Sequence, residues 1–349
     1  MTLDDFDGLL DWPGLQTWIA THDVPGDVPV TSVEQLTGGS QNNLFLLHRG
    51  DVAFVLRRPP RHLRANSNDT MLREARVLAA LAGSDVPHPR FYAACDDPSV
   101  IGACFYLMEH IDGFSTLGRI PDGHRADPDW RREMSFELVS AAASLAAIDP
   151  IAVGLGDFGK PDRWLERQVQ RWRDQLDGYA ALAGYDGPDI EGVDEVGAWL
   201  DANRPTEFRL GIIHGDLQWA NVMFAKDEPR LLAMIDWELS TLGDPLLDLG
   251  WILTSWSEPH DPPGHTTQVP FDLLPTRAEL IDRYVRLTGR DPALVPWFFV
   301  LACYKLGIIL EGTYARALAG QAPMETGRQL HDYTLWCFAK ARQLIASHA

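Results

Sequence analysis

The chain changes character about a third of the way along, and this change limits the folds open to it. Residues 30–109 are mostly short runs of β-branched and aromatic residues separated by turn residues, whereas residues 128–346 mostly have helical apolar spacing. Within the first block, apolar residues recur at helical spacing only over 70–81. The pattern predicts an α+β protein, with a small antiparallel sheet followed by a mainly helical part.

The expected elements follow from these patterns. In the first block we expect strands at 30–33, 43–47, 52–57, 89–95 and 103–109, and a helix at 70–81 with Asp69 as its N-cap. In the second block we expect helices at 129–148, 162–181, 191–203, 276–288, 292–319 and 324–346, interrupted by short apolar runs between 209 and 236. A chain of 349 residues is long for one core, so we expect three segments. They are an acidic extension at 1–24, a first lobe at 25–111 and a second lobe at 112–349.

Charge and cysteine content argue against several classes of partner. The net charge of −19 repels nucleic acid and anionic membrane surfaces, so neither is expected as a partner. The four cysteines form no C-x-x-C pair, which argues against a zinc cage or a disulfide framework. The first ten residues hold three aspartates and no basic region, so no secretory signal and a cytoplasmic location are expected. The apolar run 295–310 contains Lys305 and predicts a buried helix.

One polar segment of the second block carries the chemistry. It reads Ile213-His-Gly-Asp-Leu-Gln-Trp-Ala-Asn-Val222, and Ala233-Met-Ile-Asp-Trp-Glu238 follows. Phosphoryl transfer requires a carboxylate that orients the attacking hydroxyl, and hard oxygen ligands that hold Mg²⁺ against the phosphates. Asp216 can supply the carboxylate, and Asn221 and Asp236 can supply the ligands. The H-x-D-x-x-x-x-N spacing therefore predicts a Mg²⁺-dependent phosphoryl-transfer site.

Other sites could use some of the same residues. His214 and Asp216 could be ligands of a metal-dependent hydrolase, but the chain has no H-E-x-x-H or H-x-x-E-H motif to complete one. It also has no G-x-x-x-x-G-K-[ST] motif, which excludes P-loop chemistry. We expect His214 to orient the loop through a hydrogen bond, and Asp248 to be a partner of the same loop.

These motifs resemble a known superfamily. His214-Gly-Asp216 with Asn221 resembles the catalytic loop of the aminoglycoside phosphotransferases and choline kinases, which are related to protein kinases. Ile235-Asp-Trp-Glu238 resembles their counterpart of the D-F-G motif, and 241–250 resembles the segment that follows. The resemblance covers about residues 30–320, and within the superfamily the chain looks most similar to the phosphotransferase-like domains found beside acyl-CoA dehydrogenases.

The resemblance implies a protein-kinase-like bilobal fold and a small-molecule kinase. The kinase would transfer the γ-phosphoryl group of ATP or GTP to a hydroxyl of an aminoglycoside-like or other metabolite. Asp216 would be the catalytic base, and Asn221 and Asp236 would hold Mg²⁺. The motifs do not distinguish ATP from GTP, and they give neither the acceptor nor the oligomeric state.

The resemblance also assigns nucleotide-binding residues in the first lobe. Val55-Leu-Arg57 matches a strand that usually ends in a phosphate-binding lysine, and Glu74 matches the glutamate that pairs with it. The two could instead form only a surface ion pair, which would contribute little. The nucleotide-covering loop would contribute Gly38, Gly39, Ser40 and Asn42, and the backbone of Glu109 and Ile111 would bind the base.

The acceptor site is the least defined part of the prediction. Trp219 lies inside the catalytic loop and could narrow the site or stack on a flat acceptor. Glu238 and Asp244 could line the site or cap helices, and the loop 257–275 could contribute to it. Arg57 in place of lysine leaves open a second function, a nucleotide-binding pseudokinase or regulatory module without transfer activity.

Overall fold

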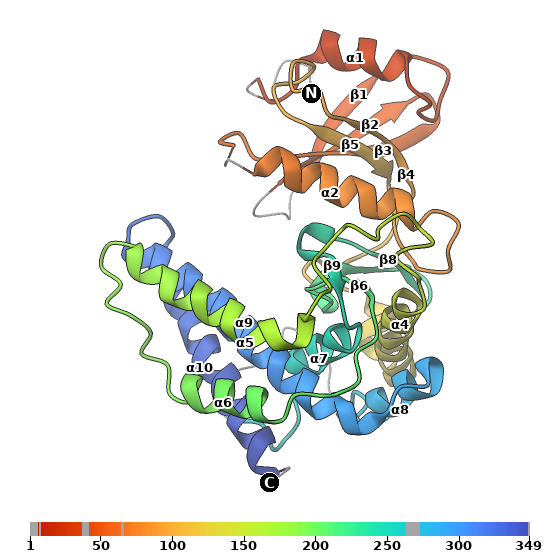
Figure 1. Ribbon diagram of the computed structural model, residues 1–349. Coiled ribbons are helices and arrows are strands. Elements are labelled where there is room, and N and C mark those ends of the chain that lie inside the picture. Colours follow the sequence, from red (N-terminus) through yellow and green to blue (C-terminus); the bar gives the residue numbers. More distant parts are fainter. Residues whose placement is uncertain (1–5, 7, 37–41, 64–65, 263–272, 348–349) are drawn as a thin grey trace.

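The computed structural model describes residues 6, 8–36, 42–63, 66–262 and 273–347 (Figure 1). Its first part is a five-stranded antiparallel sheet in the order β1-β2-β3-β5-β4. The strands are β1 Ser32–Leu36, β2 Asn43–Arg49, β3 Val52–Arg58, β4 Phe91–Cys95 and β5 Phe105–Glu109. The mixed α+β architecture expected from the sequence is confirmed.

The two faces of this sheet pack against different partners. Alternate residues of β2 and β3, such as Phe45 and Phe54, form one core with Leu15 and Ile19 of helix α1 (Trp12–Ala20). Helix α2 (Ser67–Ala80) packs on β4 and β5, and its buried residues belong to the core of the helical part. The sheet is therefore joined to the rest of the molecule through α2.

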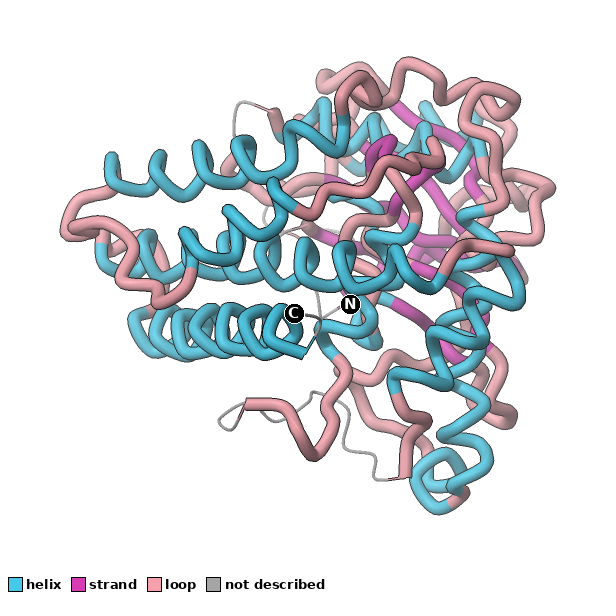
Figure 2. The backbone as a smooth tube through the Cα atoms, turned by 60° about the horizontal axis from the view of Figure 1, so that its bottom comes forward, coloured by secondary structure: helices cyan, strands magenta, loops and turns pink. Residues whose placement is uncertain are grey.

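The second part of the chain is mainly helical, and its long helices run side by side away from the strands (Figure 2). Helices α9 and α10 pack extensively on each other. The helices are α3 Asp122–Ala126, α4 Pro128–Ala146, α5 Trp164–Gly178, α6 Val193–Ala202, α7 Leu246–Ser255, α8 Arg277–Thr288, α9 Val295–Leu318 and α10 Met324–Ser347. Single 3₁₀ turns lie at Tyr179–Ala181, Trp219–Asn221, Trp237–Leu239 and Pro292–Leu294.

One segment of the described chain, Pro292–Leu318, is long and apolar enough to cross a membrane by length and composition alone. In its most apolar window 67% of the residues are buried inside the protein, which is the position of a core helix. The buried helix predicted for 295–310 is thus confirmed.

Four short strands hold the polar segment of the second part. Strand β6 (Gly211–Ile213) pairs with β9 (Thr241–Gly243), and β7 (Val222–Phe224) pairs with β8 (Leu231–Met234). Because β6 precedes the 214–221 loop and β8 leads to Asp236, both ends of the predicted site are fixed by backbone pairing.

Some sequence expectations need correction. The N-cap of α2 is Asn66, so Asp69 is not the cap and lies in the first turn, where its carboxylate interacts favourably with the helix dipole. Strand β9 and helix α3 were not expected, because three to five residues carry too little periodicity to be recognised.

Helix α8 gives a first prediction. Glu279 completes a capping box with Thr276, and its Oε1 lies 2.6 Å from Arg132 Nη2 of α4. The Thr276 backbone bond and Arg132 lower the pKa of Glu279 to about 2. We expect Glu279→Ala to lower the free energy of unfolding by about 1 kcal/mol in urea titrations. Because the folded-state pKa is depressed, this contribution is present above about pH 4.5 and is lost as the pH falls towards 2.

The matched control is Glu325→Ala, which removes an exposed first-turn carboxylate of α10. It should change stability by less than Glu279→Ala does. Equal effects of the two substitutions at pH 7 would contradict the role given to the capping box.

Candidate active site

The loop between β6 and β7 is held from below by Asp248 of α7. Its Oδ2 accepts from the His214 amide at 2.8 Å, and its Oδ1 accepts from the Gly215 amide at 2.9 Å. The His214 ring is fully buried, and burial lowers its pKa to about 4. The neutral ring therefore donates from Nε2 to the Ile235 carbonyl at 3.0 Å. The predicted structural roles of His214 and Asp248 are confirmed.

Gly215 makes the close turn of this loop. Its φ is +87°, and a Cβ at this position would lie 2.4 Å from the Leu239 carbonyl oxygen, so a larger residue would not fit. The Gly215 carbonyl accepts from Lys305 Nζ of α9 at 3.0 Å. This ammonium group is buried 4.5 Å from the ring centroid of Trp251, and burial lowers its pKa to about 8. The sequence analysis did not assign Lys305 to the site, although a lysine inside an apolar run was a signal.

The carboxylate of Asp216 is fixed by side chains on both oxygens. Oδ1 accepts from Trp251 Nε1 at 2.7 Å and from Gln218 Nε2 at 2.8 Å, and Oδ2 accepts from Asn221 Nδ2 at 2.7 Å. Burial raises its pKa to about 6, although Trp251 and Asn221 oppose the shift. Asp216 and Asn221 thus lie together, as the spacing of the motif predicts.

Asp236 lies at the end of β8 in a left-handed conformation with φ of 67°, which is uncommon outside glycine. Its Oδ1 lies 2.6 Å from Arg57 Nη2 of β3. Arg57 Nε in turn lies 2.9 Å from Glu74 Oε2 of α2, and Tyr106 donates to the same carboxylate at 3.1 Å. Both Arg57 and Glu74 are buried, so their pairing is not a surface ion pair.

The pKa values of Arg57 and Glu238 depend on several neighbouring charges. Burial alone would lower the pKa of Arg57, but Glu74, Tyr106 and Asp236 raise it above its ordinary value. Burial, followed by Asp236 and Glu74, raises the pKa of Glu238 to about 7. Glu238 therefore belongs to the same cluster of carboxylates, close enough to Asp236 to feel its charge.

A cavity of about 540 Å³ opens between the sheet and this loop. Arg57 and Met108 line it from the sheet, and Asn221 and Asp236 line it from the helical part. This volume is within the range of small-molecule sites. The cavity therefore unites residues from both parts of the chain next to Asp216.

Two residues expected at the acceptor site lie elsewhere. The indole of Trp219 is 2% exposed and stacks on Trp256 with ring centroids 5.8 Å apart, so it has no free face for an acceptor. Asp244 is fully buried, binds Arg290 through both oxygens at 2.7 and 3.0 Å, and accepts from the Leu246 amide at the start of α7. The placement of Trp219 corrects the sequence expectation, whereas Asp244 takes the helix-capping alternative that the sequence left open.

Some of the residues expected to contact the nucleotide lie within the part of the chain that the structure describes, and others do not. Gly38, Gly39 and Ser40 lie outside the described residues, and Asn42 is half-buried just before β2. The Glu109 amide donates to the Arg90 carbonyl at 2.8 Å, and the Ile111 carbonyl accepts from the Gly113 amide at 3.0 Å. The Glu109 amide is therefore already engaged and would have to exchange this partner to bind a base.

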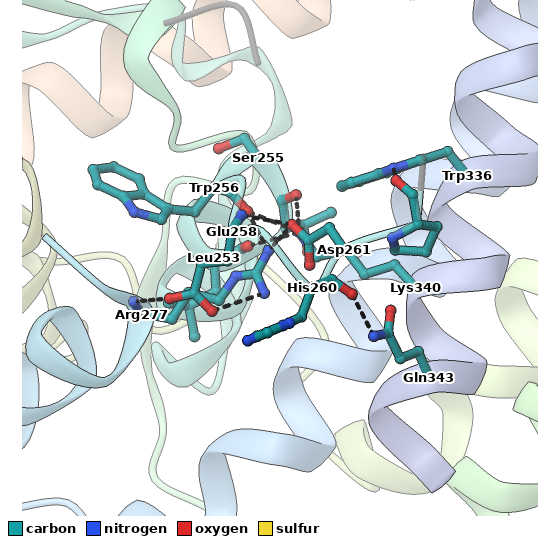
Figure 3. Close-up of polar contacts among 12 residues, drawn as sticks. Leu253, Ser255, Trp256, Glu258, His260, Asp261, Arg277, Trp336, Lys340 and Gln343 are labelled. Atoms are coloured by element: carbon teal, nitrogen blue, oxygen red, sulfur yellow. Dashed lines mark hydrogen bonds and ion pairs between the residues drawn. The ribbon is translucent and has the colours of Figure 1, made fainter. Parts of the chain in front are cut away.

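The described start of the 257–275 loop is anchored rather than open (Figure 3). Asp261 forms an ion pair with Arg277 and lies 3.5 Å from Lys340 Nζ, and Glu258 accepts from the Arg277 amide at 2.7 Å. Lys340 also donates to three carbonyls at the end of α7 and just beyond it, those of residues 253, 254 and 256. Residues 257–262 are thus tied to α8 and α10.

A comparison with known protein families identifies the family to which the chain belongs. The family model of the phosphotransferase enzyme family matches residues 32–294. The chain belongs to this family. The match covers the sheet, the loop of Asp216 and the strand that leads to Asp236, so it includes Arg57, Asp216, Asn221 and Asp236.

Curated relatives of this family member are longer proteins. The chain is 34% identical over 334 residues to acyl-CoA dehydrogenase family member 11 of Rattus norvegicus, covering 88% of the chain and 41% of the relative. It is 31% identical over 303 residues to family member 10 of Mus musculus, covering 84% and 27%. The chain therefore spans less than half the length of these relatives, in agreement with the resemblance expected from the sequence.

Solved structures show the same fold. A Ralstonia eutropha protein, provisionally assigned as an aminoglycoside phosphotransferase, is 31% identical with a TM-score of 0.77, covering 95% of this chain and 98% of the other. A GDP complex of aminoglycoside 2'-phosphotransferase-IIIa has a TM-score of 0.61 at 16% identity, covering 97% and 100%. The kinase-like fold predicted from the sequence is confirmed, and the phosphotransferase family supports a small-molecule kinase.

Proposed function

We propose that the protein is a Mg²⁺-dependent kinase that transfers the γ-phosphoryl group of ATP or GTP to a hydroxyl of a small molecule. The observation that carries the proposal is that Asn221 and Asp236 line one cavity between the sheet and the helices, and that Asp216 is hydrogen-bonded to Asn221 beside it. Membership of the phosphotransferase family supports it independently. Related structures contain GDP or ADP, which supports a nucleotide co-substrate.

In this proposal Asp216 is the catalytic base. Trp251, Gln218 and Asn221 fix the direction of its carboxylate, so the acceptor hydroxyl meets a preorganised oxygen. With a pKa of about 6, the carboxylate is ionised at neutral pH and can accept the hydroxyl proton. Lys305 and Asp248 hold the backbone on which this carboxylate sits.

The donor set fits Mg²⁺. The Nδ2 of Asn221 faces Asp216, which leaves its Oδ1 as a hard oxygen ligand, and Asp236 adds a carboxylate. No cluster of three His, Cys, Asp or Glu residues suited to a metal occurs in the described part of the chain. This agrees with Mg²⁺ chemistry, because Mg²⁺ is usually held by one or two protein oxygens together with substrate phosphates. When bound, the ion supplies the charge that neutralises the phosphates.

Arg57 is proposed to bind the phosphates in place of the usual lysine. Its planar guanidinium group suits phosphate, and the buried Glu74 holds it at the cavity wall. Its contact with Asp236 must open or be shared for both groups to act on a nucleotide. This contact is also the observation that favours the second candidate function, a nucleotide-binding module without transfer activity.

The remaining assignments are parts of the same proposal. Residues 25–111 would form the nucleotide lobe, 112–349 the catalytic and acceptor lobe, and 1–24 an extension. Gly38, Gly39, Ser40 and Asn42 would cover the phosphates, and Glu109 and Ile111 would flank the base. The four cysteines are free and buried, which suits a reducing compartment such as the cytoplasm. Glu238 is the residue we place towards the acceptor.

The test is Mg²⁺-dependent transfer from labelled ATP and GTP into a panel of aminoglycosides and a cell metabolite extract. Related phosphotransferases have been solved with hygromycin B and with streptomycin, which justifies the aminoglycosides in the panel. Label in a product, dependent on Mg²⁺, would support the kinase. Nucleotide-induced stabilisation without transfer to any compound would favour the second candidate, and neither binding nor transfer would contradict both.

A further inference from the structure

A second cavity, of about 720 Å³, lies beside helix α5 and has no part in the proposed transfer site. Residues of α5, strand β9, helix α2 and the 158–163 segment line it. Two acidic residues line it, Glu166 and Asp174. Five basic residues also line it, namely Arg73, Lys160, Arg163, Arg167 and Arg171.

These five side chains are here called the basic pocket. In the described part of the chain none of them forms an ion pair with a carboxylate, whereas other arginines, such as Arg132 and Arg173, do. Arg73 instead donates to the Phe158 carbonyl at 3.0 Å, with its guanidinium carbon 4.1 Å from the Phe158 ring centroid. Arg167 donates to the carbonyls of Arg163 and Lys160.

The basic pocket has a charge opposite to that of the chain as a whole. The protein has a net charge of −19, yet this cavity gathers five cationic and two anionic side chains. Burial, and then the positive charge of the neighbouring Arg167, lower the pKa of Arg171. Because like charges held together without carboxylate partners repel, binding an anion in this cavity would be favourable.

The shape of the donors indicates the class of anion. Each guanidinium group presents parallel N–H donors that match the oxygens of phosphate in a bidentate geometry. Several guanidinium groups around one cavity suit a ligand group with more than one negative charge. The volume of the cavity is large enough for a small molecule that carries such a group. We propose that the basic pocket binds a phosphate-bearing small molecule through a diphosphate or similarly polyanionic group.

The position of the basic pocket connects it to the loop of Asp216. Thr241 lines the pocket and pairs with Ile213, the residue directly before His214. Trp172 of α5 also lies 5.5 Å from Lys305 Nζ, which binds the Gly215 carbonyl. An anion at this site would therefore sit one strand away from the loop, either as part of the acceptor or as a separate effector.

The experiment is calorimetric titration of the full chain with sodium pyrophosphate, without nucleotide or Mg²⁺, at constant ionic strength set by chloride. The test variant is Arg163→Gln combined with Arg171→Gln, because both side chains line the pocket and lie outside the proposed nucleotide cavity. The matched control is Arg125→Gln combined with Arg328→Gln, which removes two exposed arginines elsewhere.

We expect saturable binding at one site, weakened at least about tenfold in the Arg163/Arg171 variant and unchanged in the control, since each lost charged hydrogen bond contributes on this scale. Pyrophosphate should also raise the Tm of the wild type and of the control more than that of the pocket variant. Binding of pyrophosphate that is absent, or equal in all three proteins, would overturn the proposal.

Once an acceptor has been found, two kinetic measurements distinguish a pocket that binds part of the acceptor from one that binds a separate effector. Pyrophosphate that raises the KM of the acceptor without changing kcat assigns the pocket to the acceptor itself. Pyrophosphate that changes kcat at saturating acceptor assigns it to a separate ligand. The binding experiment needs no transfer activity, so its outcome is independent of the kinase proposal.

Discussion

Asp216→Asn is expected to lower kcat for phosphoryl transfer by about a thousandfold, the range lost when a positioned general base is removed. The amide nitrogen cannot accept the acceptor proton. It would also face Asn221 Nδ2, which lies 2.7 Å from the present carboxylate oxygen, so two donors would meet and the loop geometry would change. The measurement is the single-turnover rate with the acceptor found in the transfer assay.

Two comparisons make this prediction specific. Asp227→Asn makes the same chemical change on the exposed turn after β7 and should leave the rate unchanged. Nucleotide binding to the Asp216→Asn protein, measured by its effect on Tm, should persist because Arg57 and Glu74 remain. A variant that turns over within a few-fold of wild type would remove Asp216 from the mechanism.

A smaller loss is expected when only the orientation of Asp216 is disturbed. Gln218→Leu removes one of the two donors to Oδ1 and leaves Trp251 in place. The rate should therefore fall between wild type and Asp216→Asn. This ordering distinguishes a base that acts through its position from a carboxylate that only stabilises the loop.

The sequence predicted the central part of this site because its contacts are local. Asp216 and Asn221 are five residues apart in one loop, and Asp236 follows a strand pair that returns the chain to the same place. The pairing of Arg57 with Glu74 was predicted from the family resemblance of these two positions, and the structure brings their side chains to 2.9 Å. Helix ends differed from the expected ones by up to three residues, since terminal turns have weak signals.

The direction of a side chain, and its contacts with residues far along the chain, could not be read from the sequence. Trp219 belongs to the catalytic loop, yet a 3₁₀ turn directs its indole onto Trp256, 37 residues further along the chain. Lys305 reaches Gly215 across 90 residues. Periodicity reports which face of an element is apolar, but not which distant polar group meets it.

Asp244 and Arg290 give the second large effect. Both side chains are almost fully buried, and the two bonds between them measure 2.7 and 3.0 Å. Removing Asp244 leaves the buried Arg290 charge with only the exposed Glu207, whose Oε1 lies 3.6 Å from Arg290 Nε, and breaking a buried pair costs about 3–5 kcal/mol. We therefore expect Asp244→Ala to lower the free energy of unfolding by this amount in guanidinium titrations.

Comparison with an exposed pair and with the double variant identifies the cause. Asp201→Ala breaks the surface pair with Arg204 and should cost at most about 1 kcal/mol. Asp244→Ala combined with Arg290→Met removes both charges and should recover part of the loss, because no buried guanidinium group remains. The two residues would instead act independently if Arg290→Met lowered the free energy of unfolding by the same amount in the Asp244→Ala protein as in the wild type.

The same variant tests whether Asp244 touches the acceptor. Its carboxylate is occupied by Arg290 and by the amides of Arg209 and Leu246, and none of its surface is exposed. In the folded fraction at low temperature, Asp244→Ala should therefore keep the acceptor KM, whereas Glu238→Gln should change it. A raised KM in Asp244→Ala with native stability would reverse this assignment and return Asp244 to the acceptor site.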